Sequence, residues 1–321
     1  MKIILLVTLI LLASLVLSLD FSLLTSVFQN IKISFLALAV LSLAVEISLK
    51  PLRLQILTNA LVKASYKTAV VVTLVGFPFA AITPGRLGDF VKIITLSQKT
   101  SLPLAKSFAI GIFEKLLELF SLALLVFLSV AFLFMKQTTI TPLLPLLAFI
   151  GLGSIAMVLL LHKRTMQTIL KYTYFKFLPA KYQESQKSSL KDFFLALSVI
   201  FHNVPRLLLA ILLAFLLWVN RIVQVMLLAL ALSIEIHLSY FLFIIPITFI
   251  AEIVPLTIMG LGVREYTYIF LLSLAGITKE TSVAISLLVF LFGILSLSLI
   301  GYGVVLREYG GLRKIKEHIP L

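Results

Sequence analysis

The sequence predicts an all-α protein that crosses a membrane several times, and three observations support this prediction. Charged residues make up only 12% of the chain, whereas a soluble domain has about 25% and needs them to cover its surface. Mean hydropathy is +1.17. Several apolar runs reach about 20 residues, the length of a bilayer-crossing helix. The chain is therefore expected to form a single integral membrane domain, 1–321, rather than two soluble domains.

Residue types that carry much of enzyme chemistry are scarce. The chain has no cysteine, which excludes disulfides and thiolate catalysis. Its histidines show neither an HxxxH nor an HExxH spacing, so no metal and no cofactor is expected. A non-enzymatic role is therefore predicted. The enzymatic alternative is a membrane-embedded lipid-phosphate transferase or phosphatase with Asp89 or Glu114 as its base, although the nucleophile or metal that such sites need is not visible.

Six helices are expected to cross the membrane. They occupy residues 3–19, 31–49, 105–134, 142–161, 206–234 and 281–306. The first run has the length of a signal-peptide core, with Ser18 as a cleavage point, but a polytopic protein needs no cleavable signal and we expect a retained helix. Segment 50–67 has one apolar and one polar face, with Arg53, Thr58 and Lys63 on the polar face. This pattern predicts an interfacial elbow rather than a span.

Two apolar regions are too broken for ordinary spans. Residues 68–97 are interrupted at Phe77-Pro78 and Thr83-Pro84-Gly85, and residues 238–276 at Pro246, Pro255 and Met259-Gly260-Leu261-Gly262. Proline removes a backbone donor and glycine relaxes φ, so helices are expected to end there. Non-helical backbone at membrane depth survives only inside protein or beside a watery cavity. Both regions are therefore predicted to be re-entrant hairpins.

The distribution of cations predicts the orientation. With the N-terminus in the cytoplasm, most of the 27 Lys and Arg residues fall on the cytoplasmic side. Only Lys32, Lys136 and Lys279 fall clearly outside, as the positive-inside rule requires. We therefore expect a multi-pass protein of the cell (inner) membrane with both termini cytoplasmic, including the tail 307–321.

The basic loop 162–192 interleaves cations with aromatic residues. It is interpreted mainly as a loop that sets topology, with binding of anionic headgroups as the alternative, at about 1 kcal/mol per cation. Nucleic acid is not expected as a partner, because no soluble domain would present a binding face.

A weak internal repeat runs through the chain. Thr83-Pro84-Gly85-Arg86-Leu87-Gly88 aligns with Thr257-Ile258-Met259-Gly260-Leu261-Gly262 at an offset of 174 residues. The same offset aligns the predicted helices, giving repeat 1 at about 31–134 and repeat 2 at about 205–306. The two predicted hairpins open to opposite sides of the membrane. The repeat is therefore expected to be inverted, as in many alternating-access transporters.

Charges at membrane depth are the most informative feature, since a lone charge at a helix centre costs roughly 3 kcal/mol. The residues concerned are Glu46, Arg86, Asp89, Lys92, Glu114, Lys115, Glu118, Glu252, Arg264 and Glu265. Spacings of three residues, as in Arg86 to Asp89 and Lys115 to Glu118, favour pairing on one helix face, and Glu114 and Glu118 share a face because they are four residues apart. These residues are expected to pair, to protonate or to face water.

The predicted substrate site lies at the two hairpin tips. Arg86 and Arg264 are expected to contact phosphate, because a guanidinium grips phosphate through two parallel hydrogen bonds. A helix that restarts after Pro84-Gly85 adds free N–H groups and a positive dipole end. The alternative is that the two arginines only lock the tips, through Asp89 and Glu265.

Further residues complete the predicted site. The glycines of the tips, Gly85, Gly88, Gly260 and Gly262, are included in the substrate site. Asn220 and Arg221 are expected to line the path, with helix-to-helix hydrogen bonding as an equal alternative. The residues expected to orient the arginines or to carry coupling protons are Asp89, Lys92, Glu114, Lys115, Glu118, Glu252 and Glu265.

Three motifs in order resemble a known family. They are Pro84-Gly85-Arg86-Leu87-Gly88-Asp89, Glu114-Lys115-Leu116-Leu117-Glu118 and Gly260-Leu261-Gly262-Val263-Arg264-Glu265. With this order and spacing the chain resembles the transmembrane region of lysylphosphatidylglycerol synthases, the multiple peptide resistance factor, and its stand-alone relatives. The resemblance implies lipid translocation and marks Arg86, Asp89, Glu114, Lys115, Glu118, Gly262 and Glu265 as candidate positions.

The chain departs from the family pattern in ways that affect the substrate. Lys115 and Glu118 stand where Arg and Asp are commoner, and Ile258-Met259 stand where small residues or proline are usual. The chain ends at Leu321, without room for a synthase domain, so lysyl-phosphatidylglycerol is not the expected headgroup. We expect flippase-like transport of an anionic phospholipid or polyprenyl-linked lipid. A scaffold for a separate lipid-synthesising enzyme is the alternative.

Overall fold

The computed structural model describes residues 2–83, 88–135 and 183–311, and all regular structure within these ranges is helical. The predicted span 142–161, the basic loop 162–192 up to residue 182, and the tail from residue 312 onward lie outside the described residues. Gly85 and Arg86 of the first predicted tip also lie outside them.

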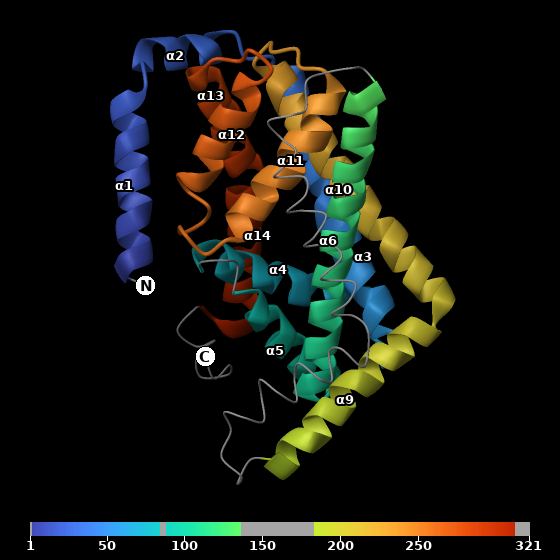
Figure 1. Ribbon diagram of the computed structural model, residues 1–321. Coiled ribbons are helices and arrows are strands. Elements are labelled where there is room, and N and C mark those ends of the chain that lie inside the picture. The colour runs from blue at the N-terminus through green and yellow to red at the C-terminus, as the bar shows by residue number, and fades with distance from the viewer. Residues whose placement is uncertain (1, 84–87, 136–182, 312–321) are drawn as a thin grey trace.

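Within residues 2–83, 88–135 and 183–311 the helices follow one another with short connections (Figure 1). In the first part of the chain they are α1 (Lys2–Ser18), α2 (Phe21–Gln29), α3 (Ile33–Thr58), α4 (Tyr66–Ile82), α5 (Asp89–Thr100) and α6 (Leu104–Met135). In the second part they are α9 (Gln183–His202), α10 (Val204–Ala231), α11 (Leu238–Ile253), α12 (Val263–Ser273), α13 (Lys279–Val289), the π-helical segment η4 (Phe290–Leu295) and α14 (Ser296–Tyr309).

Three of the described helices are long and apolar enough to cross a membrane. They are α3, α10 and the continuous helix Lys279–Tyr309, which α13, η4 and α14 form together. The pair α1 and α2, bent by 82°, makes a fourth if it counts as one span. The prediction of an all-α protein with several apolar spans is confirmed, and the runs 31–49, 206–234 and 281–306 overlap these three helices, with differences of two or three residues where a run extends past a helix end.

The bend between α1 and α2 has a local cause. Asp20 caps α2, accepting hydrogen bonds from the Ser22 hydroxyl at 2.5 Å and from the N–H groups of Ser22 and Leu23. The bond from the Ser22 hydroxyl, followed by these backbone bonds, holds the pKa of the Asp20 carboxyl below its usual value. An N-cap residue has extended backbone, so the chain turns at Asp20 and α2 runs across the end of α13 (Figure 1).

The prediction of an interfacial elbow at 50–67 is wrong for residues 50–58, which belong to α3. Helix α3 continues through Pro51 to Thr58, and the Arg53 side chain is only 1% exposed. A proline inside a helix removes one hydrogen bond and bends the helix without having to end it. The turn comes after α3, where the Asn59 side chain accepts a hydrogen bond from the Ala64 N–H at 2.7 Å. In this first half of the segment the polar side chains of Arg53 and Thr58 are therefore buried.

The helices also continue through two prolines at which breaks were predicted. Pro78 lies inside α4 and Pro246 inside α11. Pro78 has no N–H for the Leu74 carbonyl, and this carbonyl lies so close to Gly301 of α14 that a Cβ there would come within 2.2 Å of it. Packing of α14 against α4 thus covers the Leu74 carbonyl that Pro78 leaves without its helical partner, and α4 ends only at Thr83.

The two predicted hairpin regions are each a pair of packed helices. Helix α4 packs against α5, and α11 packs against α12. In Figure 1 the α4–α5 pair lies in the lower half of the molecule and the α11–α12 pair in the upper half. The arms of the first pair meet closely, since a Cβ on Gly88 would lie 2.0 Å from the backbone carbonyl of Phe79.

The core lies where α3 and α10 pack along each other. One cluster of buried apolar side chains surrounds Trp218 and Phe241, and a second surrounds Leu57 and Phe113. Helix α9 adds Phe193 to the second cluster and packs against α6. This helix differs from the prediction, since its charged first half belongs to the predicted basic loop 162–192.

Candidate functional site

A cavity with charged walls lies between the two hairpins. Its empty space is about 1230 Å³, counted with its open mouth. The charged residues that line it are Glu46, Lys50, Arg53, Lys92, Glu114, Lys115, Glu118, Arg221 and Glu252. The aromatic side chains of Phe77, Trp218 and Phe249 line other parts of the wall. The cavity therefore offers charged groups and apolar surface to the same ligand.

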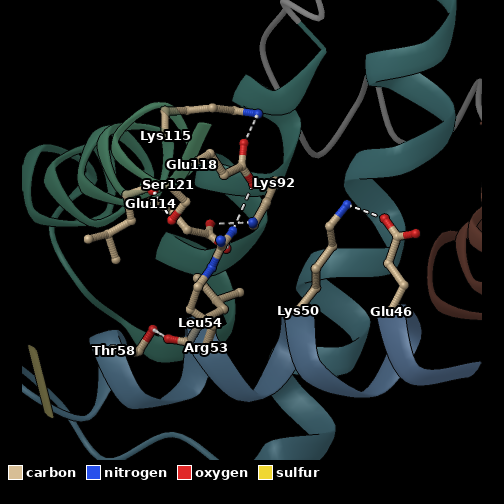
Figure 2. Close-up of polar contacts among 11 residues, drawn as sticks. Glu46, Lys50, Arg53, Leu54, Thr58, Lys92, Glu114, Lys115, Glu118 and Ser121 are labelled. Atoms are coloured by element: carbon tan, nitrogen blue, oxygen red, sulfur yellow. Dashed lines mark hydrogen bonds and ion pairs between the residues drawn. The ribbon is translucent and has the colours of Figure 1, made fainter. Parts of the chain in front are cut away.

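Five side chains form a chain of ion pairs along one wall of the cavity (Figure 2). Arg53 Nη2 donates to Glu114 Oε1 at 3.0 Å and to Glu118 Oε1 at 2.8 Å. Lys92 Nζ donates to Glu114 Oε2, and Lys115 Nζ donates to Glu118 Oε2 at 3.2 Å. We call these five residues the cavity ion-pair chain. Each carboxylate bridges two cations, so the ion pairs join α3, α5 and α6.

Helix periodicity explains how these side chains come to face the cavity. Glu114 and Glu118 are four residues apart on α6 and therefore lie on one face. On α3, Glu46, Lys50 and Arg53 follow a spacing of four and three and form a charged stripe. Lys50 Nζ lies 2.5 Å from Glu46 Oε1 and 5.0 Å above the Phe77 ring. The polar face that predicts an interfacial elbow at 50–67 thus contributes Lys50 and Arg53 to the cavity wall.

A second group of charges closes the turn between α11 and α12. The Arg264 side chain is fully buried and donates from Nη2 and Nε to Glu265 Oε1 at 2.6 and 3.1 Å. Arg264 Nε and Glu265 Oε1 also share the Ser286 hydroxyl, at 3.1 and 3.0 Å. Glu265 Oε2 accepts from the Gly262 N–H at 2.6 Å, which fixes the glycine at a φ of +84°. We call Arg264, Glu265 and Ser286 the turn lock.

The turn lock lies beside the cavity but does not line it. The Arg264 guanidinium lies 4.9 Å from the Phe290 ring centre, and its Nη1 is 4.0 Å from Glu252 Oε1. Glu252 lines the cavity, whereas Arg264 and Glu265 do not. The structure thus places Arg264 as a residue that holds the turn in this conformation.

Arg221 of α10 lines the cavity and lies against the π-helical segment η4. Its Nη1 donates to Gln224 Oε1 at 2.7 Å, and the guanidinium lies against Gly293 of the π-helical segment. A Cβ on Gly293 would come within 2.4 Å of Arg221 Nη1, so only glycine leaves this space open. Asn220 instead donates to the Ser42 carbonyl of α3 at 3.0 Å, the helix-to-helix bond that was the alternative for this residue.

The structure brings some of the predicted site residues together and leaves others elsewhere. Those that line the cavity are Lys92, Glu114, Lys115, Glu118, Arg221, Glu252 and Gly260. Those that do not line it are Gly88, Asn220, Gly262, Arg264 and Glu265. Gly85 and Arg86 lie outside the described residues, as does the side chain of Asp89, whose backbone begins α5.

Two further residues, Arg53 and Lys50, line the cavity although the sequence does not predict them there. Arg53 and Glu114 are 61 residues apart, so no local pattern connects them. The one available signal was the spacing of Glu46, Lys50 and Arg53, which continues the face of the preceding predicted helix through Pro51.

Comparison with known proteins agrees with the resemblance noted in the three motifs. No curated protein and no solved structure matches the chain. A family profile described as "Lysylphosphatidylglycerol synthase TM region" matches residues 2–301. This match includes the hairpin motifs, the cavity ion-pair chain and the turn lock. Since it covers nearly the whole sequence, the protein belongs to the family of the lysylphosphatidylglycerol synthase transmembrane region.

Proposed function

We propose that the protein translocates an anionic lipid, a phospholipid or a polyprenyl-linked lipid, across the cell membrane in a flippase-like manner. The observation that carries the proposal is the cavity, which collects charged side chains from α3, α5, α6, α10 and α11 beside aromatic ones. A lipid headgroup needs polar partners when it leaves water, since an unpaired charge at membrane depth is costly. The acyl or polyprenyl chains would stay in the bilayer.

The order of the helices supports an inverted repeat as the basis of transport. Adding the offset of 174 residues to α3, α4, α5 and α6 gives 207–232, 240–256, 263–274 and 278–309. These ranges coincide, within a few residues, with α10, α11, α12 and the helix Lys279–Tyr309. The pairs α4–α5 and α11–α12 approach the centre from opposite halves of the molecule (Figure 1). In this proposal they are re-entrant hairpins whose alternate movements open the cavity to either side.

The proposed orientation has both termini in the cytoplasm. Helix α1 begins and α14 ends in the lower half of Figure 1, the half that contains the first hairpin. The cations predicted to be cytoplasmic include Lys99 in the last turn of α5 and Lys106 in the first turn of α6, and the end of α5 and the start of α6 lie in the lower half of Figure 1. The positive-inside rule then makes this half the cytoplasmic one.

Within this proposal the site residues have distinct roles. Arg86 contacts phosphate from the tip of the first hairpin, and Arg221 from the opposite wall. Arg264 contacts phosphate only in a conformation in which the turn lock opens, because here its side chain is fully buried. Glu252 and the acids of the cavity ion-pair chain orient the cations and balance their charge when no lipid is bound.

The experiment that tests the proposal measures transbilayer movement of headgroup-labelled lipids in proteoliposomes. The panel contains phosphatidylglycerol, phosphatidic acid, a polyprenyl phosphate and zwitterionic phosphatidylcholine, with and without an ion gradient. Variants Arg86→Gln and Arg221→Gln are compared with wild type and with Lys99→Gln. Lys99 pairs with Glu308 away from the cavity and is the matched control.

Movement of an anionic lipid by wild type and Lys99→Gln, but not by the two folded arginine variants, would support translocation. If folded wild type moves no lipid under any gradient, the transport proposal is wrong and a scaffold for a lipid-modifying enzyme takes its place.

A further inference from the structure

We infer that Arg53 is the main phosphate-binding residue of the cavity, that Lys92 assists it, and that Glu114 occupies the phosphate position when no ligand is bound. The ligand class is a phosphate ester with one negative charge, a phosphodiester headgroup. That this headgroup belongs to a transported lipid rests on the proposed function, whereas the binding site itself does not.

The first argument is the geometry of Glu114. Its Oε1 accepts from Arg53 and its Oε2 accepts from Lys92, so one carboxylate joins two cations from different helices. Two oxygens of a phosphate would join the same cations in the same manner, because guanidinium and ammonium groups bind both anions through charged hydrogen bonds. Glu114 is itself 5% exposed and the Arg53 side chain 1% exposed, so water does not compete strongly at this point.

The second argument is the state of the Arg53 donors. One nitrogen, Nη2, serves both Glu114 and Glu118, while the buried Nε has no hydrogen-bond partner. A guanidinium carries five N–H donors, and a buried donor without an acceptor is unfavourable. Since Arg53 also lines the cavity, a phosphate that takes the place of Glu114 can serve as an acceptor for this incompletely paired guanidinium.

The third argument is the charge of the cavity wall. Among the described residues that line it, five cations face four carboxylates. The cations are Lys50, Arg53, Lys92, Lys115 and Arg221, and the acids are Glu46, Glu114, Glu118 and Glu252. One surplus positive charge matches the single negative charge of a phosphodiester. A phosphomonoester, which carries nearly two charges at neutral pH, would leave one uncompensated.

Exchange of anions follows from these observations. A phosphate that binds Arg53 and Lys92 displaces Glu114 from both cations, so Glu114 competes with the ligand. Glu118 keeps its ion pair with Lys115 and is not displaced. Removing the charge of Glu114 should therefore strengthen phosphate binding, whereas removing the charge of Arg53 should weaken it.

The test is a fluorescence titration in detergent. The protein has a single tryptophan, Trp218, and this residue lines the cavity, so its emission reports directly on binding there. The probes are short-chain phosphatidylglycerol as the diester, short-chain phosphatidic acid as the monoester, inorganic phosphate, and short-chain phosphatidylcholine. The variants are Arg53→Gln, Arg53→Lys, Glu114→Gln and the control Lys99→Gln.

We expect saturable binding of phosphatidylglycerol to wild type and Lys99→Gln, and weaker binding of the monoester, of phosphatidylcholine and of inorganic phosphate. Arg53→Gln should weaken binding about tenfold or more. Arg53→Lys should weaken binding less, because the positive charge remains, but still measurably, because the planar guanidinium is lost. Glu114→Gln should tighten binding several-fold. Because Glu114→Gln is expected to raise the affinity, the inference can still be tested if Arg53→Gln does not fold.

Unchanged binding by folded Arg53→Gln, or weaker binding by folded Glu114→Gln, would overturn the inference and leave translocation untouched. Tighter binding of inorganic phosphate or the monoester than of the diester would overturn the ligand class. Conversely, Arg53-dependent binding of phosphatidylglycerol without any lipid movement in proteoliposomes would keep this site and refute the proposed function.

Discussion

The cavity ion-pair chain and the turn lock are both built from a buried arginine and glutamates, but they differ in how the chain brings them together. Arg53 meets acids that are 61 and 65 residues away on another helix, whereas Arg264 meets the next residue, Glu265. The first group lines the cavity and the second does not. Burial of an arginine therefore does not identify a binding site. What distinguishes the two is whether the paired charges border space that a ligand can enter.

The largest effect expected from this comparison is on stability. Arg264→Gln leaves the Glu265 carboxylate buried without its cation, and breaking a buried pair in this way costs about 3–5 kcal/mol. Arg53→Gln should cost less, because Glu114 keeps Lys92 and Glu118 keeps Lys115. Thermal unfolding of both variants in detergent measures the difference. Equal loss of stability would show that the cavity ion-pair chain is as much a structural lock as the turn lock.

The next effect concerns the contact between the arms of the first hairpin. Gly88→Ala places a Cβ 2.0 Å from the backbone of Phe79, which cannot move aside as a flexible side chain would. Overpacking of this kind costs typically 1–3 kcal/mol. Gly303→Ala is the matched control, because a Cβ there has no neighbour within 4 Å. A Gly88→Ala protein that melts at the same temperature as Gly303→Ala would show that α4 and α5 do not depend on this contact.

Gly293→Ala is expected to change stability less than Gly88→Ala but to reduce lipid movement. The Gly293→Ala methyl group meets the end of the Arg221 side chain, which can rotate, so the loss of stability should stay within about 1 kcal/mol. The displaced guanidinium must move within the cavity that it lines. Lipid movement in proteoliposomes should therefore fall while the melting temperature hardly changes. Normal transport would mean that the position of Arg221 is not critical.

The smallest effect is expected where charges face solvent. Lys99 and Glu308 pair at 2.5 Å between α5 and α14, with side chains 37% and 23% exposed. Exposed ion pairs contribute typically 0.2–1 kcal/mol, and salt screens them. Lys99→Gln should lower the melting temperature slightly at low salt and not at high salt. A loss similar to that of Arg264→Gln would contradict the division between exposed and buried pairs.

The sequence alone was sufficient for the helical class and for the approximate positions of the three long apolar helices, because apolar run length is a local property. It was also sufficient for the acids of the cavity, since charges inside apolar runs are visible without a structure. It did not reveal the cavity face of α3. Amphipathic spacing at 50–67 is the same whether the polar side faces water or buried partners, and only the packing of α6 against α3 distinguishes the two.

The role of the prolines could not be predicted for a similar reason. Pro78 and Pro246 weaken the helix locally, but whether the helix continues depends on its neighbours. In α4 the neighbour is Gly301 of α14, more than 200 residues away in the sequence. Likewise, the interpretation of residues up to 192 as loop followed from their charges, and α9 is helical because its later residues pack against α6.

The π-helical segment has a consequence for changes in chain length. Losing one residue from an ordinary α-helix turns everything beyond it by about 100° relative to its neighbours. A π-helical turn contains one surplus residue, so a deletion within Phe290–Leu295 can be absorbed by return to α-helix. Ser286 before the segment and Gly301 after it would both keep their present faces. The third candidate span should thus tolerate the loss of Phe292, whereas removing one residue from the middle of α3 should misalign Glu46 with Arg53.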